Sequence, residues 1–381
     1  MTGQPIIKGW CPGALRPMMS GDGLVVRVRP IAGRLTQDQA RSIAALSAAH
    51  GNGLIDVSSR ANIQLRGVTE QTHAPLIEGL RAGGLIDADI AAESRRNIVV
   101  TPFYDEGDQT EALAIALSDA LATATTLDLP GKFGFAVDCG RVPVLTDAPA
   151  DIRFERDNGG QLLLRPDGSN FGRPVTAETA VPEAFDLASW FIAQRGEARR
   201  MRHLTSRQEC SLPKSFDTPC QPGMVRARPG ATTSGLLVAF AFGQIRSETL
   251  MALADIGALR FTPWRMVMIE EASSVADLPE LITDADDSLL RVVACTGAPA
   301  CSQALGETRA LARSLAPLTQ ADETLHVSGC AKGCAHPGAA DLTLTATNAG
   351  YDLIQHGRAD ADPVRPAMTP HQILQFLTKA R

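Results

Sequence analysis

Four cysteines in the last quarter of the chain set the strongest constraint on its fold. Five residues separate Cys295 from Cys301, and three separate Cys330 from Cys334. Cysteine thiolates ligate iron–sulfur clusters, so two close pairs can supply the four sulfurs that one 4Fe-4S cluster needs. Glycine and proline between the cysteines let the backbone turn tightly enough for both members of a pair to reach it. The spacing therefore predicts that the fold brings two separate loops around one cluster.

Two other interpretations of these cysteines compete with a cluster. A single buried pair is often small apolar packing. A structural zinc site with four cysteines usually has two to four residues inside each pair. The five residues between Cys295 and Cys301 fit that spacing poorly. The two pairs together therefore favour cluster ligation over both alternatives.

The residues around the cysteines resemble the cluster signature of the sirohaem-dependent sulfite and nitrite reductases. The resemblance covers residues 295–301, residues 329–334 and the strand-like residues 341–344. In that family four such cysteines bind a 4Fe-4S cluster, and the last of them also bridges to the sirohaem iron. The resemblance implies that Cys334 lies nearest to a tetrapyrrole site.

The order of the expected elements indicates an internal duplication. An alternating strand at residues 24–29 precedes a helix that begins at a capping box formed by Thr36 and Gln39. A strand and a helix of the same kind recur from residue 236. A second unit begins with a strand at residues 98–100 and recurs from residue 292. The chain therefore contains a first and a second kind of unit, followed by a second copy of each in the same order.

The reductase resemblance implies a fold that explains this repetition. We expect an α+β, internally duplicated sulfite/nitrite-reductase-like fold, in which a ferredoxin-like half-domain and a cluster- and tetrapyrrole-binding α+β domain each occur twice. The cluster belongs to the second copy, since the first has Cys139 alone in the comparable place. The expected segments are an N-terminal arm at 1–20, ferredoxin-like half repeats at 21–85 and 220–275, and reductase-like repeats at 90–205 and 288–381.

Composition excludes several classes of function. A hydrophobic fraction of 44% and a charged fraction of 20% are ordinary for a globular protein. The net charge of −6 argues against general nucleic-acid binding. The first residues lack the pattern of a signal peptide, and no apolar run approaches the length of a membrane span. We expect a cytoplasmic protein with reduced or metal-bound cysteines and with neither nucleic acid nor membrane as a partner.

Three basic segments resemble active-site segments of the same family. They are residues 59–66, 95–98 and 130–134. In the reductases such cations hold the tetrapyrrole carboxylates and the small anion at the iron. Cations in a dry cleft strengthen anion binding and stabilise developing negative charge. The resemblance implies substrate contacts from four side chains, Arg60, Arg66, Arg96 and Lys132; it assigns no catalytic residue.

Two positions depart from the reductase pattern. Gly134 stands where the lysine loop of the family usually carries a second lysine. In the repeated arginine strand, Trp264 stands where a basic residue is common, and Arg265 is displaced by one position. A site without one anion-binding lysine is less suited to sulfite or nitrite, so the departures favour a neutral small reactant.

The N-terminal residues 9–18 and 20–23 resemble the precorrin-3B synthases, shorter members of the same superfamily that act in aerobic cobalamin biosynthesis. This resemblance implies a monooxygenase that hydroxylates precorrin-3A with dioxygen while a ring acetate closes to a lactone. A sirohaem-dependent ferredoxin sulfite or nitrite reductase is the alternative, and a non-catalytic iron–sulfur electron carrier is a third possibility. The role of Cys11 stays open.

The same resemblance implies the cofactors and the electron source. A 4Fe-4S cluster and a mononuclear non-haem iron are expected, with sirohaem only under the reductase alternative. The ligands of the second iron are not evident, and His336 beside Cys334 is better explained as a hydrogen-bonding neighbour of the cluster. No GxGxxG motif follows a strand, so electrons from NADH should arrive through a separate reductase or a ferredoxin.

Overall fold

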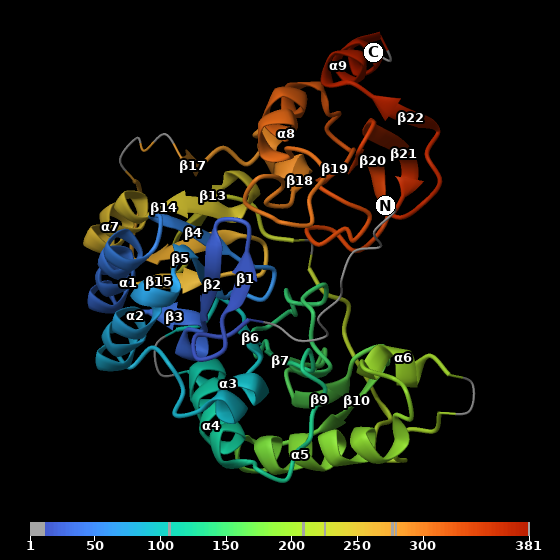
Figure 1. Cartoon of the computed structure of the whole chain (residues 1–381). Coiled ribbons are helices and arrows are strands. Elements are labelled where there is room, and N and C mark those ends of the chain that lie inside the picture. Colours follow the sequence, from blue (N-terminus) through green and yellow to red (C-terminus); the bar gives the residue numbers. More distant parts are fainter. Residues whose placement is uncertain are drawn as a thin grey trace.

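The described part of the chain forms four β-sheets with helices packed around them. Figure 1 shows two sheets close together in the blue and yellow body, a third in the cyan-to-green region and a fourth in the orange-to-red region. The computed structural model describes residues 12–105, 108–207, 210–224, 226–275, 278 and 280–379.

The first sheet has the strand order β1-β2-β5-β4-β14, and β1, β2, β5 and β4 are antiparallel to their neighbours. Helices α1 and α2 pack beside each other next to it. Its own elements are β1 (Met18–Ser20), β2 (Gly23–Val28), β4 (Leu54–Val57), β5 (Ile63–Val68), α1 (Gln37–His50) and α2 (Glu70–Ala82).

The start of α1 confirms the capping box expected from the sequence. The Thr36 hydroxyl accepts the Gln39 N–H at 3.2 Å, and the Gln39 side chain accepts the Thr36 N–H at 3.1 Å. These two bonds satisfy backbone donors that have no partner within the first helical turn. The helix ends before Gly51, close to the expected position.

The second sheet repeats the first and has the order β12-β13-β16-β15-β3, with β17 also paired to β13. Helix α7 packs against α1 of the first unit. The elements are β12 (Gly230–Thr232), β13 (Gly235–Phe240), β15 (Leu259–Phe261), β16 (Met266–Glu270), β17 (Leu281–Ile282) and α7 (Ser247–Ile256).

The two half-domains exchange edge strands. Strand β14 (Gln244–Arg246), from the second half, pairs with β4 of the first sheet. Strand β3 (Arg34–Leu35), from the first half, pairs with β15 of the second. Leu35 and Ile245 are buried on these exchanged strands. Each half therefore completes the sheet of the other, and one apolar core runs through both.

Matching backbone conformations confirm the expected duplication. Ala32 and Phe242 occupy equivalent tight turns, η1 (Ile31–Gly33) and η2 (Ala241–Gly243), and both have positive φ, 51° and 60°. Ala61 and Arg265 are a second such pair, at 56° and 63°. Positive φ is uncommon outside glycine. Positive φ at two pairs of equivalent positions indicates that the two halves share the same backbone conformation.

The third and fourth sheets form the other repeated pair. Their orders are β11-β10-β9-β8-β7-β6 and β18-β19-β20-β21-β22. In each, three parallel strands lead into an antiparallel ladder. The strands are β6 (Ile98–Val100), β7 (Phe135–Val137), β8 (Ile152–Arg156), β9 (Leu162–Pro166), β10 (Phe171–Pro174), β11 (Thr218–Pro219), β18 (Val292–Ala294), β19 (Leu325–Ser328), β20 (Ala340–Thr347), β21 (Gly350–Gly357) and β22 (Arg365–Met368).

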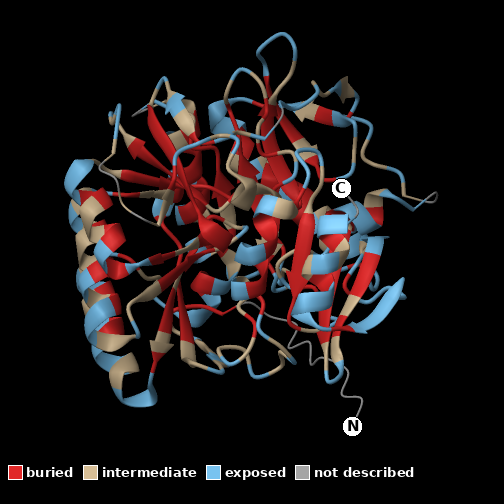
Figure 2. Cartoon of the chain, turned by 90° about the horizontal axis from the view of Figure 1, so that it is seen from above, coloured by how far each residue is buried: buried red, intermediate tan, exposed pale blue. Residues whose placement is uncertain are grey.

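Helices cover the third and fourth sheets, and Figure 2 shows exposed helix surfaces around buried strands. A separate apolar core joins the third sheet to α4 and α5. None of the described helices is long and apolar enough to cross a membrane. The remaining helices are α3 (Ile90–Arg95), α4 (Gln109–Thr123), α5 (Ala177–Gln194), α6 (Met201–Thr205), α8 (Arg309–Leu315), α9 (Pro370–Lys379), η3 (Ser288–Arg291) and η4 (Ala316–Leu318).

The segment limits expected from the sequence cut through none of these elements. Two short strands outside the expected segments nevertheless join sheets, since β11 pairs with β10 and β17 pairs with β13. Strand β1, which the sequence assigned to the N-terminal arm, is an edge of the first sheet. The expected domain limits stay a prediction.

The packing of α7 yields a prediction about stability. Leu250 is fully buried in the shared core, whereas Ile256, at the end of the same helix, is 39% exposed. Leu250→Ala should lower the free energy of unfolding by about 2–5 kcal/mol, because it leaves a cavity where the helices meet. Ile256→Ala, the matched control, should stay within about 0.5 kcal/mol of the parent. Urea unfolding followed by circular dichroism would measure both, and equal losses would contradict the assigned packing.

Candidate functional site

Two of the four predicted cluster ligands lie at the carboxyl ends of neighbouring strands. Cys295 follows β18, and Cys330 follows Gly329 at the end of β19. The two strands are parallel, so their carboxyl ends meet at one edge of the fourth sheet. The Gly329 N–H donates a hydrogen bond to the Cys295 sulfur at 3.2 Å. Strand pairing therefore brings together loops that lie far apart in the sequence.

Backbone hydrogen bonds connect the Cys301 loop to the Cys330 loop. The Cys301 N–H donates to the Gly297 carbonyl at 2.8 Å, which closes a tight turn. The Leu305 N–H donates to the Gly329 carbonyl at 2.7 Å. Gly297 has φ of +71°, and a Cβ there would lie 2.5 Å from the Thr308 hydroxyl oxygen. This turn consequently requires glycine.

The four thiols influence one another electrostatically. Burial raises the pKa of Cys330 and of Cys334, and the negative charges of Cys295 and Cys301 raise both further. Lys332 acts in the opposite direction on both thiols. The four side chains therefore share one environment, and their donor set fits a 4Fe-4S cluster. Ligation would require each thiol to lose its proton.

The expected second iron has no evident ligand set. Within the described ranges, no three His, Cys, Asp or Glu side chains come close enough together to hold a single metal ion. Thiols around a cluster of several irons stand farther apart than the ligands of one ion, so this finding concerns the mononuclear site. That site stays a prediction. Cys11, whose role the sequence left open, lies outside the described residues.

A cavity of about 270 Å³ adjoins two of the cysteines, Cys295 and Cys334. It lies where both half-domains meet the fourth sheet. Three arginines and one carboxylate give its wall a net positive charge. Besides the cysteines, the residues that line it include Arg27, Asp56, Ser58, Ser59, Gln64, Phe242, Arg265 and Arg309.

Hydrogen bonds orient the polar residues of this cavity. Arg27 and Gln64 face each other on β2 and β5, and the guanidinium donates to the Gln64 side-chain oxygen. The Asp56 carboxylate accepts bonds from Gln244 at 2.9 Å and from Arg309 at 3.1 Å. A buried carboxylate of this kind fixes the direction of the arginine beside it.

Arg265 reaches the cavity through its left-handed backbone. Its guanidinium donates to the Ala335 carbonyl at 2.8 Å, one residue beyond Cys334. Burial lowers the pKa of Arg265 to about 10, and the neighbouring cations Arg226 and Arg309 add to the effect. The side chain is still protonated at neutral pH. A basic residue displaced by one position in the sequence thus still faces the cysteines.

The structure brings Arg60, Lys132 and Gly134 together. Arg60 follows Ser59, which lines the cavity, but neither Arg60 nor Lys132 is among the lining residues. The Arg60 guanidinium donates to the Lys132 carbonyl at 2.9 Å. A Cβ at Gly134 would lie 3.0 Å from the Arg60 Nη1 atom and 3.1 Å from the Asn97 carbonyl oxygen. The Arg60 guanidinium therefore packs over Gly134, at the position where the reductases usually carry the second lysine. The Lys132 ammonium is exposed and has no hydrogen bond or ion pair within the described part of the chain.

The other two expected substrate contacts have carboxylate partners inside the protein. Arg66 holds both carboxylate oxygens of Asp22, at 2.6 and 3.0 Å. Arg96 holds both oxygens of Asp87, at 2.6 and 2.8 Å. Both arginines are buried. Contact of all four expected side chains, Arg60, Arg66, Arg96 and Lys132, with a substrate stays a prediction.

Two histidines lie side by side behind the Cys334 loop. The sequence singled out His336, whose Nε2 atom lies 3.0 Å from the Ala339 carbonyl oxygen. Its ring centre is 5.6 Å from that of His326 on β19. Burial lowers the pKa of His326 to about 4, and His336 and Arg265 contribute, so the ring stays neutral at pH 7. The sequence did not single out His326, because its place beside His336 follows from how β19 pairs with its neighbouring strands.

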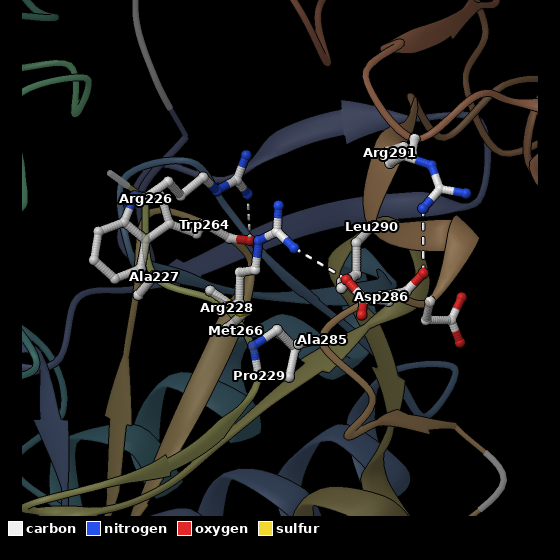
Figure 3. Close-up of a pocket in the computed structure, with 12 residues that line it drawn as sticks. Arg226, Ala227, Arg228, Pro229, Trp264, Met266, Ala285, Asp286, Leu290 and Arg291 are labelled. Carbon is white, nitrogen blue, oxygen red and sulfur yellow. Dashed lines mark hydrogen bonds and ion pairs between the residues drawn. The ribbon is translucent and has the colours of Figure 1, made fainter. Parts of the chain in front are cut away.

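A larger cavity of about 490 Å³ lies beside Trp264, the residue of the second half that stands in the place of Arg60 (Figure 3). Its arginines bind oxygens of the protein itself. Arg226 donates to the Trp264 carbonyl at 2.9 Å, and Arg228 pairs with Asp286 at 3.1 Å. None of the four cysteines lines it. The smaller cavity is the candidate site, because Cys295 and Cys334 line it.

Comparisons with known proteins agree with this fold. Residues 16–83 match the family model of the nitrite/sulfite reductase ferredoxin-like half domain. A precorrin-3B synthase of Sinorhizobium sp is 29% identical, over 93% of this chain and 84% of its own length. A ferredoxin–nitrite reductase of Synechococcus elongatus is 25% identical, over 86% and 77%. The structure of the Mycobacterium tuberculosis NirA protein aligns with a TM-score of 0.64 at 17% identity, over 93% of this chain and 79% of that one. The expected relationship and the expected fold are confirmed.

The cluster ligands can be tested one by one. Serine at Cys295, Cys301, Cys330 or Cys334 should abolish the brown absorbance and the bound iron of anaerobically purified protein, because serine is a poor ligand for an iron–sulfide core. The control changes, Cys139→Ser, Cys210→Ser and Cys220→Ser, should leave both unchanged. Full iron content in Cys330→Ser would contradict the assignment.

Proposed function

We propose that this protein is a monooxygenase of the precorrin-3B synthase type, which hydroxylates precorrin-3A with dioxygen and forms a lactone. The observation that carries the proposal is the similarity to the Sinorhizobium precorrin-3B synthase along 93% of this chain. That the chain is an enzyme, and an oxidoreductase, is supported by its similarity to that synthase and to ferredoxin–nitrite reductases. A role in cobalamin biosynthesis follows from the first of these relatives.

The cations at the cavity suit a substrate with many carboxylates. Arg27, Arg265 and Arg309 line its wall. Arg60 follows the lining residue Ser59 and donates to the Lys132 carbonyl. Arginine presents two parallel donors to a carboxylate, while lysine acts as a point charge. Such contacts strengthen as a cleft loses water. We infer that Arg60 and Lys132 hold carboxylate arms of the tetrapyrrole, which orients the ring toward Cys334.

The four cysteines Cys295, Cys301, Cys330 and Cys334 would hold the 4Fe-4S cluster, which supplies electrons one at a time when bound. Two electrons from NADH, passed on by a separate reductase or ferredoxin, and two protons convert one oxygen atom of dioxygen to water. The other oxygen atom enters the substrate as the new hydroxyl group. The lactone oxygen comes from the acetate side chain, whose carboxyl group loses its proton.

The surroundings of Arg60 favour dioxygen over an oxyanion as the small reactant. A site for sulfite or nitrite needs positive charge directed at that anion. Gly134 provides none, and the overlying Arg60 leaves little room for a longer side chain there. A sirohaem-dependent nitrite or sulfite reductase remains the second candidate, favoured by the 25% identity to the Synechococcus nitrite reductase.

The contacts to substrate carboxylates can be measured directly. Arg60→Ala and Lys132→Ala should each weaken precorrin-3A binding about tenfold to a hundredfold, since a charge-assisted hydrogen bond contributes about 1.5–3 kcal/mol. Arg358→Ala removes an exposed arginine paired with Asp360 and serves as the control. Titration at constant iron content gives the affinities. Parent affinity in both the Arg60→Ala and the Lys132→Ala variant would place the carboxylates elsewhere.

Isotopic oxygen distinguishes the two candidate reactions. With precorrin-3A, a reductant and heavy dioxygen, one heavy atom should enter the product as its hydroxyl group. Label taken only from heavy water, or turnover without dioxygen, would refute the monooxygenase. Sulfite- or nitrite-dependent oxidation of a reduced dye by protein with tightly bound sirohaem would establish the reductase instead.

A further inference from the structure

The tip of the β1–β2 hairpin contacts the loop that carries Cys301. A single carbonyl oxygen, that of Ala300, accepts three hydrogen bonds from this side. The donors are the Gly21 N–H at 3.0 Å, the Ser20 hydroxyl at 2.7 Å and the Arg66 Nη2 atom at 3.1 Å. Residues of the first half-domain thus hold a loop of the fourth sheet.

Gly21 allows this close approach. A Cβ at Gly21 would lie 2.2 Å from the Pro299 carbonyl oxygen and 2.9 Å from the Ala300 carbonyl carbon. Both atoms belong to the backbone, so no side-chain rotation could relieve the clash. The hairpin therefore needs glycine at its tip to reach the cysteine loop.

Arg66 is held rigidly in the position from which it binds this loop. Its guanidinium makes two bonds to Asp22, another to the Ser20 hydroxyl at 3.3 Å, and lies 3.7 Å from the Asp56 carboxylate. Its side chain is only 6% exposed. A buried, doubly paired guanidinium loses little further freedom when it also donates to Ala300.

The three hydrogen bonds to the Ala300 carbonyl oxygen determine the orientation of the peptide bond before Cys301, a predicted cluster ligand. The carbonyl of Ala300 and the N–H of Cys301 belong to one planar peptide unit. Three donors hold the carbonyl end, while the Cys301 N–H donates to the Gly297 carbonyl at 2.8 Å. Both ends of this peptide are consequently fixed, and with them the direction in which the Cys301 side chain leaves the backbone.

We propose that Arg66, oriented by Asp22 and assisted by Ser20, is a positioning residue for the iron–sulfur cluster that acts through the peptide before Cys301. The role differs from the substrate contact that the family resemblance implied for Arg66. It rests on the cluster assignment of the proposed function and is independent of the reaction catalysed, because it concerns the ligand loop alone.

Arg66→Met tests this role in the full-length, cluster-loaded protein without substrate. The variant should lose iron to a chelator about tenfold faster than the parent, since one charge-assisted bond to the loop is gone. The electron paramagnetic resonance spectrum of its reduced cluster should also change shape. A general loss of stability would not alter that spectrum in protein that still holds its cluster.

Arg34→Met is the matched control. Arg34 forms a two-bond ion pair with Glu270 in the second sheet, with both distances at 2.7 Å. It should keep the parent rate of iron loss and the parent spectrum. Equal effects in the two variants, or a parent-like Arg66→Met, would overturn the proposal.

Ser20→Ala provides a second test if Arg66→Met does not fold. It removes only the hydroxyl bond to Ala300 and should accelerate iron loss a few-fold, with a smaller spectral change. Parent behaviour of Ser20→Ala would also count against the proposal. If the parent protein binds no cluster, the cluster assignment itself fails, an outcome distinct from an unaltered variant.

Discussion

The exchange of edge strands between the two half-domains is the interaction on which the candidate site depends. Strand β14 completes the first sheet and β3 completes the second, so neither half can turn relative to the other without breaking a ladder. This fixed arrangement brings Arg27 and Asp56 of one half to the same cavity as Arg265 of the other. The fourth sheet then adds the cysteines. A site built from three parts of the chain is rigid because the halves are interlocked.

The two copies have diverged at equivalent positions. In the copy without the cluster cysteines, Arg260 donates to Glu270 at 2.6 Å, to the Pro102 carbonyl at 2.9 Å, and lies 3.8 Å above the ring of Tyr104. These groups fill the space next to the end of β6. In the other copy the corresponding space, next to Cys295, is the cationic cavity. A buried cation is stable only with hydrogen-bonding and charged partners. The partners of Arg260 occupy the space that is a cavity in the other copy. The two copies therefore differ in how this one space is packed.

The sequence predicted the features that depend on local spacing. The spacing within each cysteine pair, the capping box of α1 and the repetition of elements all involve residues close together in the chain or patterns repeated along it. It did not predict Arg27 and Gln64 as neighbours, because their contact follows from the register of β2 on β5. Nor could it indicate that Arg265 faces the cysteines, which needs a left-handed backbone at that residue. Asp22 lay within a recognised motif, yet only the folded hairpin reveals its pairing with Arg66.

Gly134 links the packing of the site to its choice of reactant. Its N–H donates to the Asp151 carboxylate at 2.9 Å, and that carboxylate is buried and paired with Arg200. The backbone at this position is therefore held from below while Arg60 lies above it. A Cβ at this position would already contact the Arg60 guanidinium, so Arg60 would have to shift to admit a lysine. If carboxylates of a tetrapyrrole occupy the remaining cations, no positive charge is left to hold a small oxyanion. A neutral reactant needs none, which is consistent with the dioxygen chemistry of the proposed function.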